Sequence, residues 1–437
     1  MNGLLTDLYE LTMAAGYFEA GKAAERATFE FAIRRLPAGR NFVLMAGLPQ
    51  VVEYLLQLSF AEEEIEYLRG LPQFHRVSSG FFDYLRRFRF TGDLFAAPEG
   101  TPLFAGQPVL TIRAPIVEAQ LPETFVLSAI TFPALVASKA ARCVAAAGGR
   151  AVVEFGTRRA HTAEAGVLGA RAAYLGGCAG TSNTLAGFRF GIPVKGTAAH
   201  SWVMSFSSET ESFRQLQNVL GEHTVQLIDT YDTIEGARRA AQLGKPLWGV
   251  RIDSGDSLAL SRHVRAVLDE AGLREAQIMV SGDLDEYKIR ELARAGAPID
   301  AFGVGTQLAT SGDAPFMNAT YKMVELDIGG INRFTAKLSE DKISLPGAKQ
   351  VFRELERDVV ARSGECGKGE ALLRPVLIGG RLVEPLPTLE QARCRAAESL
   401  GRMPQALREL EVADPWPIVH SRELRELIDR THRNLSP

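Results

Sequence analysis

Residues 277–306 read QIMVSGDLDEYKIRELARAGAPIDAFGVGT and fit a strand, a helix and a second strand in succession. The runs 277–280 and 299–304 are apolar, and the segment 285–295 between them has helical periodicity. Each apolar run leads into a short turn with glycine, SGD at 281–283 and GT at 305–306. Two buried strands joined through a helix predict a parallel sheet that is covered on both faces.

The same rhythm extends outward from this stretch. Further β-type runs lie at 151–155, 192–195, 224–228, 247–252 and 321–326, and helical stretches at 233–242 and 257–271 separate several of them. This repetition favours a (β/α) barrel over a small open sheet, although both topologies fit. We therefore predict an irregular (β/α) barrel over residues 121–330, with an alanine-rich helix near 118–147 at its start.

The two ends of the chain follow a different pattern. Residues 1–120 mix a helix at 4–20, a half-buried strand at 27–33 and helices near 47–58 and 61–70, which predicts an α+β domain. Residues 331–437 carry a β-type segment at 372–382 and charged helices. We expect this C-terminal segment to pack back on the N-terminal domain.

Composition excludes several classes of function. The chain has 437 residues, 46% hydrophobic and 23% charged, which is typical of a globular protein with a large core. A formal net charge of −3 is not that of a nucleic-acid-binding protein. Any anionic substrate must therefore be bound by local arginines and backbone N–H groups rather than by a general positive field.

The cysteines and the N-terminal residues indicate where in the cell the protein is expected. Cys143, Cys178, Cys366 and Cys394 are scattered, so we expect neither a disulfide framework nor a structural zinc site. Residues 1–13 lack a basic region followed by an apolar run, and no uninterrupted apolar stretch reaches the roughly 18 residues of a membrane span. We expect a cytoplasmic protein without a signal peptide and without a membrane segment.

Unusual polar clusters follow the apolar runs, each where a strand is predicted to end. In a barrel these ends share one face, so residues far apart in sequence would converge there as an active site. Turns after strands are commonly polar, but a whole series in the same position favours one site over scattered turns. The clusters are GTRR at 156–159, GTAAHS at 196–201, DTYD at 229–232, RIDSGD at 251–256, SGD at 281–283 and GVGT at 303–306.

The chemistry of these turns fits a phosphorylated substrate. Glycine lets backbone N–H groups approach a phosphate closely, which favours Ser281, Gly282 and Asp283, and Gly303, Gly305 and Thr306, as phosphate-binding residues. Arg158 and Arg159 are suited to bidentate contacts with phosphate oxygens, although surface salt bridging would explain either one singly. Asp253 is a candidate ligand of Mg²⁺ or of ribose hydroxyls, whereas Asp256 also fits a helix N-cap.

His200 alone among seven histidines lies in a strand-end turn with the other clusters. An isolated histidine is more often structural, but this position favours a catalytic role. A neighbouring carboxylate, for which Asp229 is the candidate, would orient the ring and leave one nitrogen nucleophilic.

These segments resemble the nicotinate phosphoribosyltransferase family. The resemblance spans nearly the whole chain in order, and its motifs are jointly very specific. The matching stretches are LLTDLYELTMAAGY, FEFAIRRLPAGRNF, EFGTRRAH, GTSNTLAG, PVKGTAAHS, LIDTYDT, GVRIDSGD, SGDLDE, GVGTQL and KLSEDKISLPGAKQVFR.

The resemblance implies a type II phosphoribosyltransferase: an irregular α/β barrel beside an α+β domain, working as a homodimer with shared active sites. It implies that nicotinate, phosphoribosyl pyrophosphate (PRPP) and ATP, with Mg²⁺, give nicotinate mononucleotide, pyrophosphate, ADP and phosphate. The histidine that matches His200 is phosphorylated by ATP in such enzymes.

The resemblance also assigns substrate contacts. Tyr9 would reach across the dimer to stack on the pyridine ring opposite Phe155, and Thr197 with Arg251 would contact nicotinate. Thr306 lies where the family binds the PRPP phosphate. Nicotinamide-using relatives carry an aspartate in the GTSNTLAG segment, where this chain has Ser182 and Asn183; a neutral site there avoids repelling a carboxylate. We therefore count Asn183 among the expected nicotinate contacts.

Other functions remain open at this stage. A nicotinamide enzyme and a decarboxylating quinolinate enzyme belong to the same class, and the latter would need several cations for two carboxylates. A barrel aldolase would need a Schiff-base lysine at a strand end, for which Lys195 is the candidate. A non-catalytic barrel would keep the apolar strands without the polar strand-end set, and that set is present.

Overall fold

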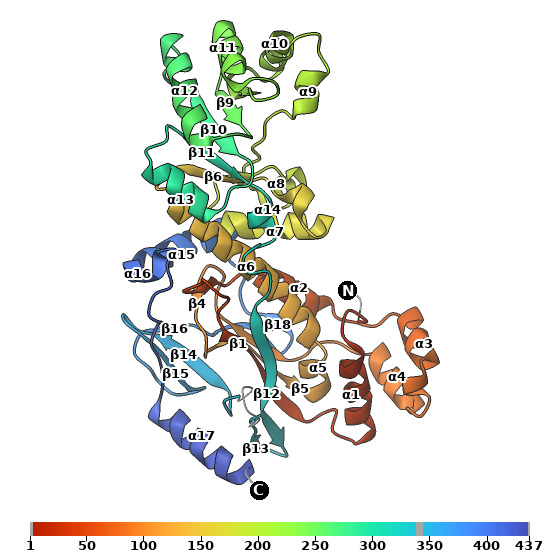
Figure 1. Cartoon of the computed structure of the whole chain (residues 1–437). Helices are drawn as coiled ribbons and strands as arrows, with labels where there is room; N and C mark the ends of the chain where they lie inside the picture. Colours follow the sequence, from red (N-terminus) through yellow and green to blue (C-terminus); the bar gives the residue numbers. More distant parts are fainter. Residues whose placement is uncertain (1–2, 338–343, 436–437) are drawn as a thin grey trace. The chain divides into compact units, whose positions relative to one another are not determined.

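The computed structural model describes residues 3–337 and 344–435, which form two compact units. The first, here called the antiparallel-sheet unit, comprises Met1–Ala134, Phe316–Arg395 and Ala413–Pro437. The second, the parallel-sheet unit, comprises Leu135–Pro315 and Ala396–Val412. Residues 338–343, part of the KLSEDKISLPGAKQVFR stretch, lie outside the described residues. Figure 1 labels many of the elements of both units.

These bounds differ from the expected 1–120, 121–330 and 331–437. The long apolar helix α6 (Glu123–Ala146) begins in one unit and ends in the other, so the change of unit falls inside a continuous helix. Residues 316–330 belong to the antiparallel-sheet unit, and residues 396–412 to the parallel-sheet unit. The remaining C-terminal residues share a unit with the N-terminal region.

The parallel-sheet unit is built on six strands in the order β7-β6-β11-β10-β9-β8, and every neighbouring pair is parallel. Val194 adds a single bridge to Thr181 beside β7, where a full strand was expected at 192–195. Among the described residues no pairing joins that edge to β8. The strands are β6 (Ala151–Glu154), β7 (Gly180–Thr181), β8 (Val225–Leu227), β9 (Gly249–Ile252), β10 (Gln277–Ser281) and β11 (Ala301–Val304).

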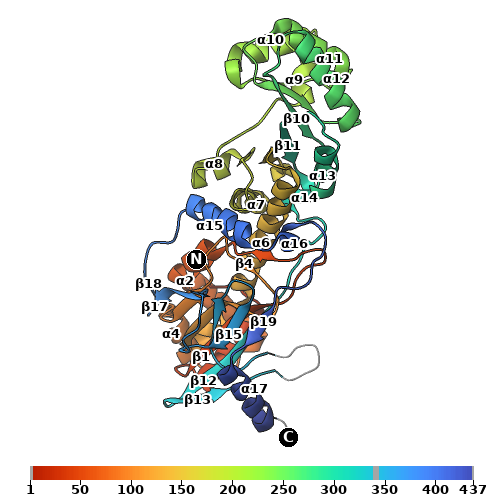
Figure 2. The same cartoon turned by 90° about the vertical axis from the view of Figure 1, so that its left-hand side faces the viewer.

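The helices between these strands begin where side chains cap their free N–H groups. Thr162, Asn183, Ser208, Asp232, Asp256 and Asp285 each accept a hydrogen bond from a backbone N–H of the first helical turn. Helices α10, α11 and α12 lie side by side (Figure 2). The helices are α7 (Ala163–Leu175), α8 (Thr184–Phe190), α9 (His200–Met204), α10 (Glu209–Leu220), α11 (Thr233–Leu243), α12 (Ser257–Glu270), α13 (Glu286–Arg294), α14 (Thr306–Ala309) and α16 (Gln405–Arg408).

The apolar run 321–326 was expected to extend the parallel sheet, and this expectation is wrong. It lies in β12 (Asn318–Ile328), which pairs antiparallel with β1 (Arg26–Arg35) in the other unit. Its Tyr321 stacks on Phe29 of β1, and the Tyr321 hydroxyl donates to the carbonyl of Ala119 at 2.6 Å. The partner strand, not the run itself, decides which sheet an apolar segment joins.

The antiparallel-sheet unit holds a seven-stranded sheet in the order β13-β12-β1-β5-β3-β17-β18 and a four-stranded sheet in the order β16-β14-β15-β19. A small β2–β4 pair and short helices complete it. The further strands are β2 (Val43–Leu44), β3 (Asp93–Ala96), β4 (Pro102–Leu103), β5 (Pro108–Pro115), β13 (Ile331–Phe334), β14 (Lys349–Arg353), β15 (Asp358–Arg362), β16 (Glu370–Ala371), β17 (Arg374–Ile378), β18 (Arg381–Leu382) and β19 (Ile418–His420). The helices are α1 (Leu8–Glu19), α2 (Leu48–Gln57), α3 (Glu62–Gly70), α4 (Ser79–Arg86), α5 (Ile116–Gln120) and α17 (Arg422–Leu435), and α15 (Leu389–Arg402) leads into the other unit.

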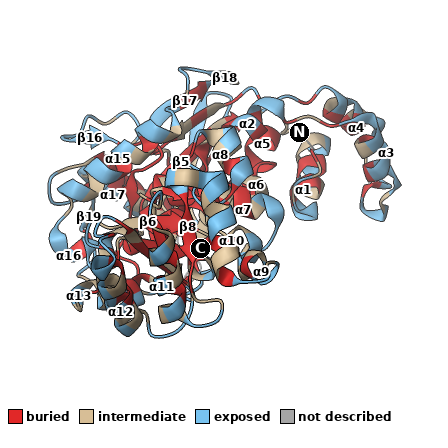
Figure 3. Cartoon of the chain, turned by 90° about the horizontal axis from the view of Figure 1, so that it is seen from above, coloured by how far each residue is buried: buried red, intermediate tan, exposed pale blue. Residues whose placement is uncertain are grey.

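Burial follows the strands, as Figure 3 shows for β6 and β8. The helical stretch Ile116–Ala146 is long and apolar enough to cross a membrane by length and composition, with a mean hydropathy of 1.5. Of its most apolar window, 61% is buried inside the protein. The core helix of a soluble protein passes the same test, so this helix is weak evidence for a membrane span.

Candidate active site

Two pockets adjoin at the carboxyl ends of the parallel strands, with volumes of about 250 and 440 Å³. They share Phe155, Arg158, Arg251 and Asp253. The pocket here called the glycine-turn pocket is also lined by Arg159, Ser281, Gly282, Asp283, Leu284, Gly303, Gly305, Thr306 and Gln307. The other, the histidine pocket, is also lined by Thr157, Ser182, Gly196, Thr197, Ala198, Ala199, His200 and Leu227.

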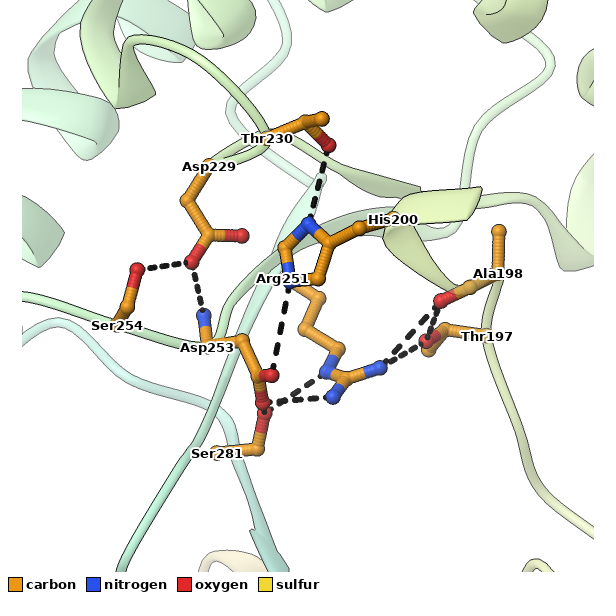
Figure 4. A network of polar contacts seen from close by, with 9 residues as sticks. All are labelled: Thr197, Ala198, His200, Asp229, Thr230, Arg251, Asp253, Ser254 and Ser281. Carbon is orange, nitrogen blue, oxygen red and sulfur yellow. Dashed lines mark hydrogen bonds and ion pairs between the residues drawn. The ribbon is translucent and has the colours of Figure 1, made fainter. Parts of the chain in front are cut away.

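Arg251 on β9 is the centre of a polar network between the pockets (Figure 4). Its guanidinium donates to the hydroxyl of Thr197 at 2.6 Å, to the hydroxyl of Ser281 at 2.8 Å and to the carboxylate of Asp253 at 2.6 Å. It also lies over the Phe155 ring, with Cζ 5.6 Å from the ring centroid. A planar cation held by three partners and an aromatic face is a fixed positive charge at the pocket wall.

Asp253 follows β9 and remains ionised. Burial would raise the pKa of its carboxyl, but the Ser281 hydrogen bond and the charge of Arg251 outweigh it and lower the pKa below its ordinary value. One carboxylate oxygen, Oδ1, takes the bonds from Arg251 and Ser281. The other, Oδ2, lies 3.8 Å from Nε2 of His200.

His200 begins α9, and its side chain is 40% exposed. Its Nδ1 lies 3.1 Å from the hydroxyl of Thr230, and its Nε2 faces Asp253. Asp229, the expected partner, does not contact the ring: its Oδ2 accepts the backbone N–H of Asp253 at 2.9 Å and the Ser254 hydroxyl at 2.7 Å. Asp229 therefore holds the turn after β9, and Thr230 is the residue that contacts Nδ1 of the ring (Figure 4).

The glycine turns need their glycines for steric reasons. Gly282 has φ +91°, and a Cβ there would lie 2.0 Å from the carbonyl oxygen of Asp253. At Gly303 a Cβ would lie 2.6 Å from the Phe155 ring. Asp283 also has positive φ, at 45°. The SGD turn is thereby held against Asp253, and the GVGT turn against Phe155.

Arg158 and Arg159 follow β6 in a short helical turn, Thr157–Arg159, and both side chains are exposed. Within the described residues neither makes an ion pair or a side-chain hydrogen bond, which argues against surface salt bridging as their role. Lys195 is exposed and lines neither pocket, so it is poorly placed for Schiff-base chemistry.

Asn183 was predicted to contact nicotinate, but it lines neither pocket. It is 6% exposed and caps α8, and its amide donates to the Thr157 hydroxyl at 3.1 Å. The neighbouring Ser182 lines the histidine pocket instead. Side chains of successive residues point in opposite directions at the end of a strand. A prediction that is wrong by one residue therefore names a residue behind the pocket, Asn183, instead of the residue that lines it, Ser182.

Sequence reasoning missed Glu154, the last residue of β6. It is 2% exposed, and its carboxylate accepts the backbone N–H of Gly156 and, at 2.5 Å, the Thr181 hydroxyl. Burial raises its pKa, against these two hydrogen bonds, which lower it. An acidic residue inside an otherwise apolar strand was the available signal. Glu154 supports the turn that carries Thr157 and Arg158.

Tyr9 lies on α1 in the antiparallel-sheet unit, with 46% of its surface exposed. Burial of its hydroxyl and the nearby carboxylates of Glu123 and Glu10 raise its pKa. The hydroxyl therefore stays protonated and hydrogen-bonded, while much of the side chain remains accessible.

A metal ion would find few protein ligands here. No group of three or more His, Cys, Asp or Glu side chains suited to a metal occurs in the described part of the chain. Mg²⁺ commonly takes one or two carboxylates and completes its shell with water and substrate phosphates. Asp253, which lines both pockets and whose Oδ2 is not taken by Arg251 or Ser281, fits that limited role.

Comparison with known proteins agrees with this geometry. Residues 4–131 match the family model for the nicotinate phosphoribosyltransferase N-terminal domain, and residues 151–344 match the model for the nicotinate phosphoribosyltransferase family. A nicotinate phosphoribosyltransferase of Mycobacterium tuberculosis is 46% identical over 423 residues, covering 94% of this chain and 89% of that protein. The Bacillus subtilis enzyme is 41% identical over 359 residues, covering 80% and 72%, and the Mus musculus enzyme is 32% identical over 521 residues, covering 98% and 96%.

Solved structures agree as well. Human nicotinic acid phosphoribosyltransferase superposes with a TM-score of 0.86 at 29% identity, covering 98% of this chain and 100% of that one. A nicotinate-nucleotide pyrophosphorylase from Pyrococcus furiosus gives a TM-score of 0.73 at 26% identity, covering 92% and 95%. Both family models, the full-length relatives and the strand-end residues lead to one assignment: the chain belongs to the nicotinate phosphoribosyltransferase family.

Proposed function

We propose that this protein makes nicotinate mononucleotide and pyrophosphate from nicotinate and PRPP, coupled to ATP cleavage through a phosphohistidine, in NAD salvage. The observation that carries the proposal is the pair of adjoining pockets that share Arg251 and Asp253. The glycine-turn pocket has glycine turns and arginines that can bind phosphates. The histidine pocket has an aromatic ring and a fixed cation that can bind a pyridine carboxylate. A glycosyl transfer needs the two substrates next to each other, and the residues that the two pockets share allow this.

We assign nicotinate to the histidine pocket. The carboxylate would meet Arg251 and Thr197, and the ring would lie on Phe155. Among the residues that the structure describes, Asp253 is the only acidic one on this wall, and its charge is already paired with Arg251. That favours nicotinate over nicotinamide. A quinolinate substrate would need a second strong cation at the same ring, and Arg158 is the available candidate.

We assign PRPP to the glycine-turn pocket. The backbone N–H groups of the SGD and GVGT turns, the Thr306 hydroxyl and the guanidinium groups of Arg158 and Arg159 supply donors for its phosphates. The pyridine nitrogen attacks the anomeric carbon as the bond to pyrophosphate breaks, and the pyridine nitrogen keeps the new positive charge. Mg²⁺, when bound, neutralises the departing pyrophosphate. Asp253 supports the ribose or this ion, and the walls hold the two reacting atoms in line.

Nε2 is the nitrogen of His200 that we propose receives the phosphoryl group, because Nδ1 already contacts Thr230. The γ-phosphoryl group passes from ATP to Nε2 and ADP leaves; water later releases phosphate and restores the ring. The added negative charge beside Asp253 would change the affinity for PRPP and Mg²⁺, and so couple ATP cleavage to turnover.

Incubation with nicotinate, PRPP and Mg²⁺, with and without ATP, tests the proposal by the mononucleotide formed. We expect ATP to stimulate the wild-type protein, and His200→Ala to remove the stimulation while slow ATP-independent turnover persists. His161→Ala, at an exposed histidine outside both pockets, is the matched control. Full ATP coupling in His200→Ala contradicts the phosphohistidine. Competition among nicotinate, nicotinamide and quinolinate decides the pyridine.

We further propose a homodimer in which Tyr9 of one protomer completes the nicotinate site of its partner. The accessible side chain of Tyr9 supports this, together with the family resemblance. Mixing Tyr9→Ala with His200→Ala protomers should then restore about one quarter of the wild-type sites, because only mixed dimers contain an intact one. Mixed dimers without ATP-stimulated activity would show that Tyr9 acts within its own protomer, and full activity of Tyr9→Ala alone would show that Tyr9 has no role.

A further inference from the structure

Buried charges gather around Lys139 of α6, outside both pockets. The Lys139 side chain is 1% exposed, and its ammonium pairs with the carboxylate of Glu286, which is 0% exposed. The same ammonium lies 2.8 Å from Oδ1 of Asp313. Arg142, one turn along α6, donates to the other oxygen of Glu286 at 2.9 Å. Taking such charges out of water is costly, and apolar residues of similar size would often be as stable or more so.

The two carboxylates belong to segments that carry the phosphate-side turns. Glu286 is the first residue of α13 and follows the SGD turn after Leu284 and Asp285. Lys288 of the same helix donates to the carbonyl oxygen of Asp283 at 2.8 Å, which ties the turn to α13. Asp313 lies just beyond α14, the helix that begins at Thr306 of the GVGT turn.

The segment between α14 and Asp313 is compact, so a restraint on Asp313 reaches the pocket. The hydroxyl of Thr310 donates to the Thr306 carbonyl at 2.7 Å, and the Gly312 N–H donates to the Gln307 carbonyl at 3.0 Å. Thr306 and Gln307 themselves line the glycine-turn pocket. One ammonium is therefore shared by the segments behind both turns.

We propose that Lys139 is a positioning residue for PRPP: by bridging Glu286 and Asp313 it sets the spacing between the SGD and GVGT turns so that both meet one substrate. The proposal rests on the function proposed above, since it presumes that PRPP occupies the glycine-turn pocket. Two turns that bind different parts of one phosphorylated substrate lose affinity when their separation drifts, because small misplacements weaken every contact at once.

Asp313→Asn is the sharpest test, because Asp313 is 33% exposed and the buried Lys139–Glu286 pair remains intact. We expect the KM for PRPP to rise by roughly fivefold or more, while the KM for nicotinate and kcat at saturating PRPP change by less than about twofold. Asp313→Glu, which keeps the carboxylate, should recover part of the PRPP affinity. Glu411→Gln removes the Arg290–Glu411 ion pair at an exposed site of the same unit and serves as the control for a lost ion pair.

The outcomes separate this inference from the proposed function. If wild-type protein forms mononucleotide but Asp313→Asn keeps its KM for PRPP and loses only thermal stability, the cluster is structural and the inference is wrong. If wild-type protein forms no mononucleotide and calorimetry detects no PRPP binding, the proposed function itself is wrong. A selective rise in the KM for PRPP with restoration by Asp313→Glu supports the positioning role.

Discussion

Nδ1 of His200 lies 3.1 Å from the hydroxyl oxygen of Thr230, the residue next to the carboxylate that the sequence indicated as its partner. The hydroxyl fixes the ring plane, and Nε2 faces Asp253 at 3.8 Å. Because Nδ1 contacts a hydroxyl and not a carboxylate, the negative charge next to the imidazole is that of Asp253, which faces Nε2.

Thr230→Val should weaken ATP coupling without abolishing it. The substitution keeps the shape and removes one hydrogen bond, worth about 1 kcal/mol or roughly fivefold in the fraction of productive ring orientation. The ratio of mononucleotide formed with and without ATP measures the effect, and Thr230→Ser, which keeps a hydroxyl, should restore it. An unchanged ratio in Thr230→Val would show that the ring is oriented by other groups.

Arg251→Lys should lower kcat/KM for nicotinate by at least about tenfold, although the charge is retained. A single ammonium cannot reach Thr197, Ser281 and Asp253 together, whereas the guanidinium donates to all three. Arg239→Lys is the control, because Arg239 pairs with Glu209 in the same unit and lines neither pocket. Equal losses in both variants would mean that Arg251 acts on stability alone, which thermal melting would report.

The parallel sheet and the meeting of its strand-end residues were predictable because both follow from local patterns. Apolar runs, intervening helices and glycine turns can each be recognised from a short segment of sequence. The pockets accordingly bring together Arg158, His200, Asp253, Ser281 and Thr306 from separate turns. Long-range pairing is not local, and so the run 321–326 was assigned to the wrong sheet.

The contacts between residues of the site were harder to predict than which segments form the site. Asp229 and Thr230 are adjacent, as are Ser182 and Asn183, and in each pair the backbone decides which side chain faces the pocket or the ring. That choice depends on the turn after each strand, which hydrogen bonds such as that from the Asp253 N–H to Asp229 establish only in the folded chain.

Gly282→Ala should destabilise the parallel-sheet unit and raise the KM for PRPP. The added methyl group meets both a backbone conformation that disfavours side chains, φ +91°, and the Asp253 carbonyl oxygen at 2.0 Å. Gly272→Ala is the matched control, because Gly272 has φ +75° with no atom within 4 Å of a Cβ. We expect Gly272→Ala to cost about 1 kcal/mol and Gly282→Ala clearly more, in chemical denaturation. Equal losses in the free energy of unfolding would show that the backbone moves away from the Asp253 carbonyl without cost.

Glu10→Gln should flatten the dependence of stability on pH in the antiparallel-sheet unit. Glu10 is 0% exposed, and burial, with the nearby Glu123, raises its pKa from 4.5 to about 7 despite hydrogen bonds from Thr124. A raised carboxyl pKa favours the neutral acid in the folded state. Its stabilising contribution is therefore full below about pH 4.5 and is lost as the pH rises through about 7.

The free energy of unfolding, measured between pH 5 and 8, checks this sign. The shift in pKa sets an upper bound of roughly 3 kcal/mol on the loss across that window in the wild-type protein. Glutamine carries no charge at any of these values, so the variant should lose much less, while Glu53→Gln at an exposed position of α2 should behave as wild type. A variant whose stability falls with rising pH as steeply as that of the wild type would show that another group titrates in this range.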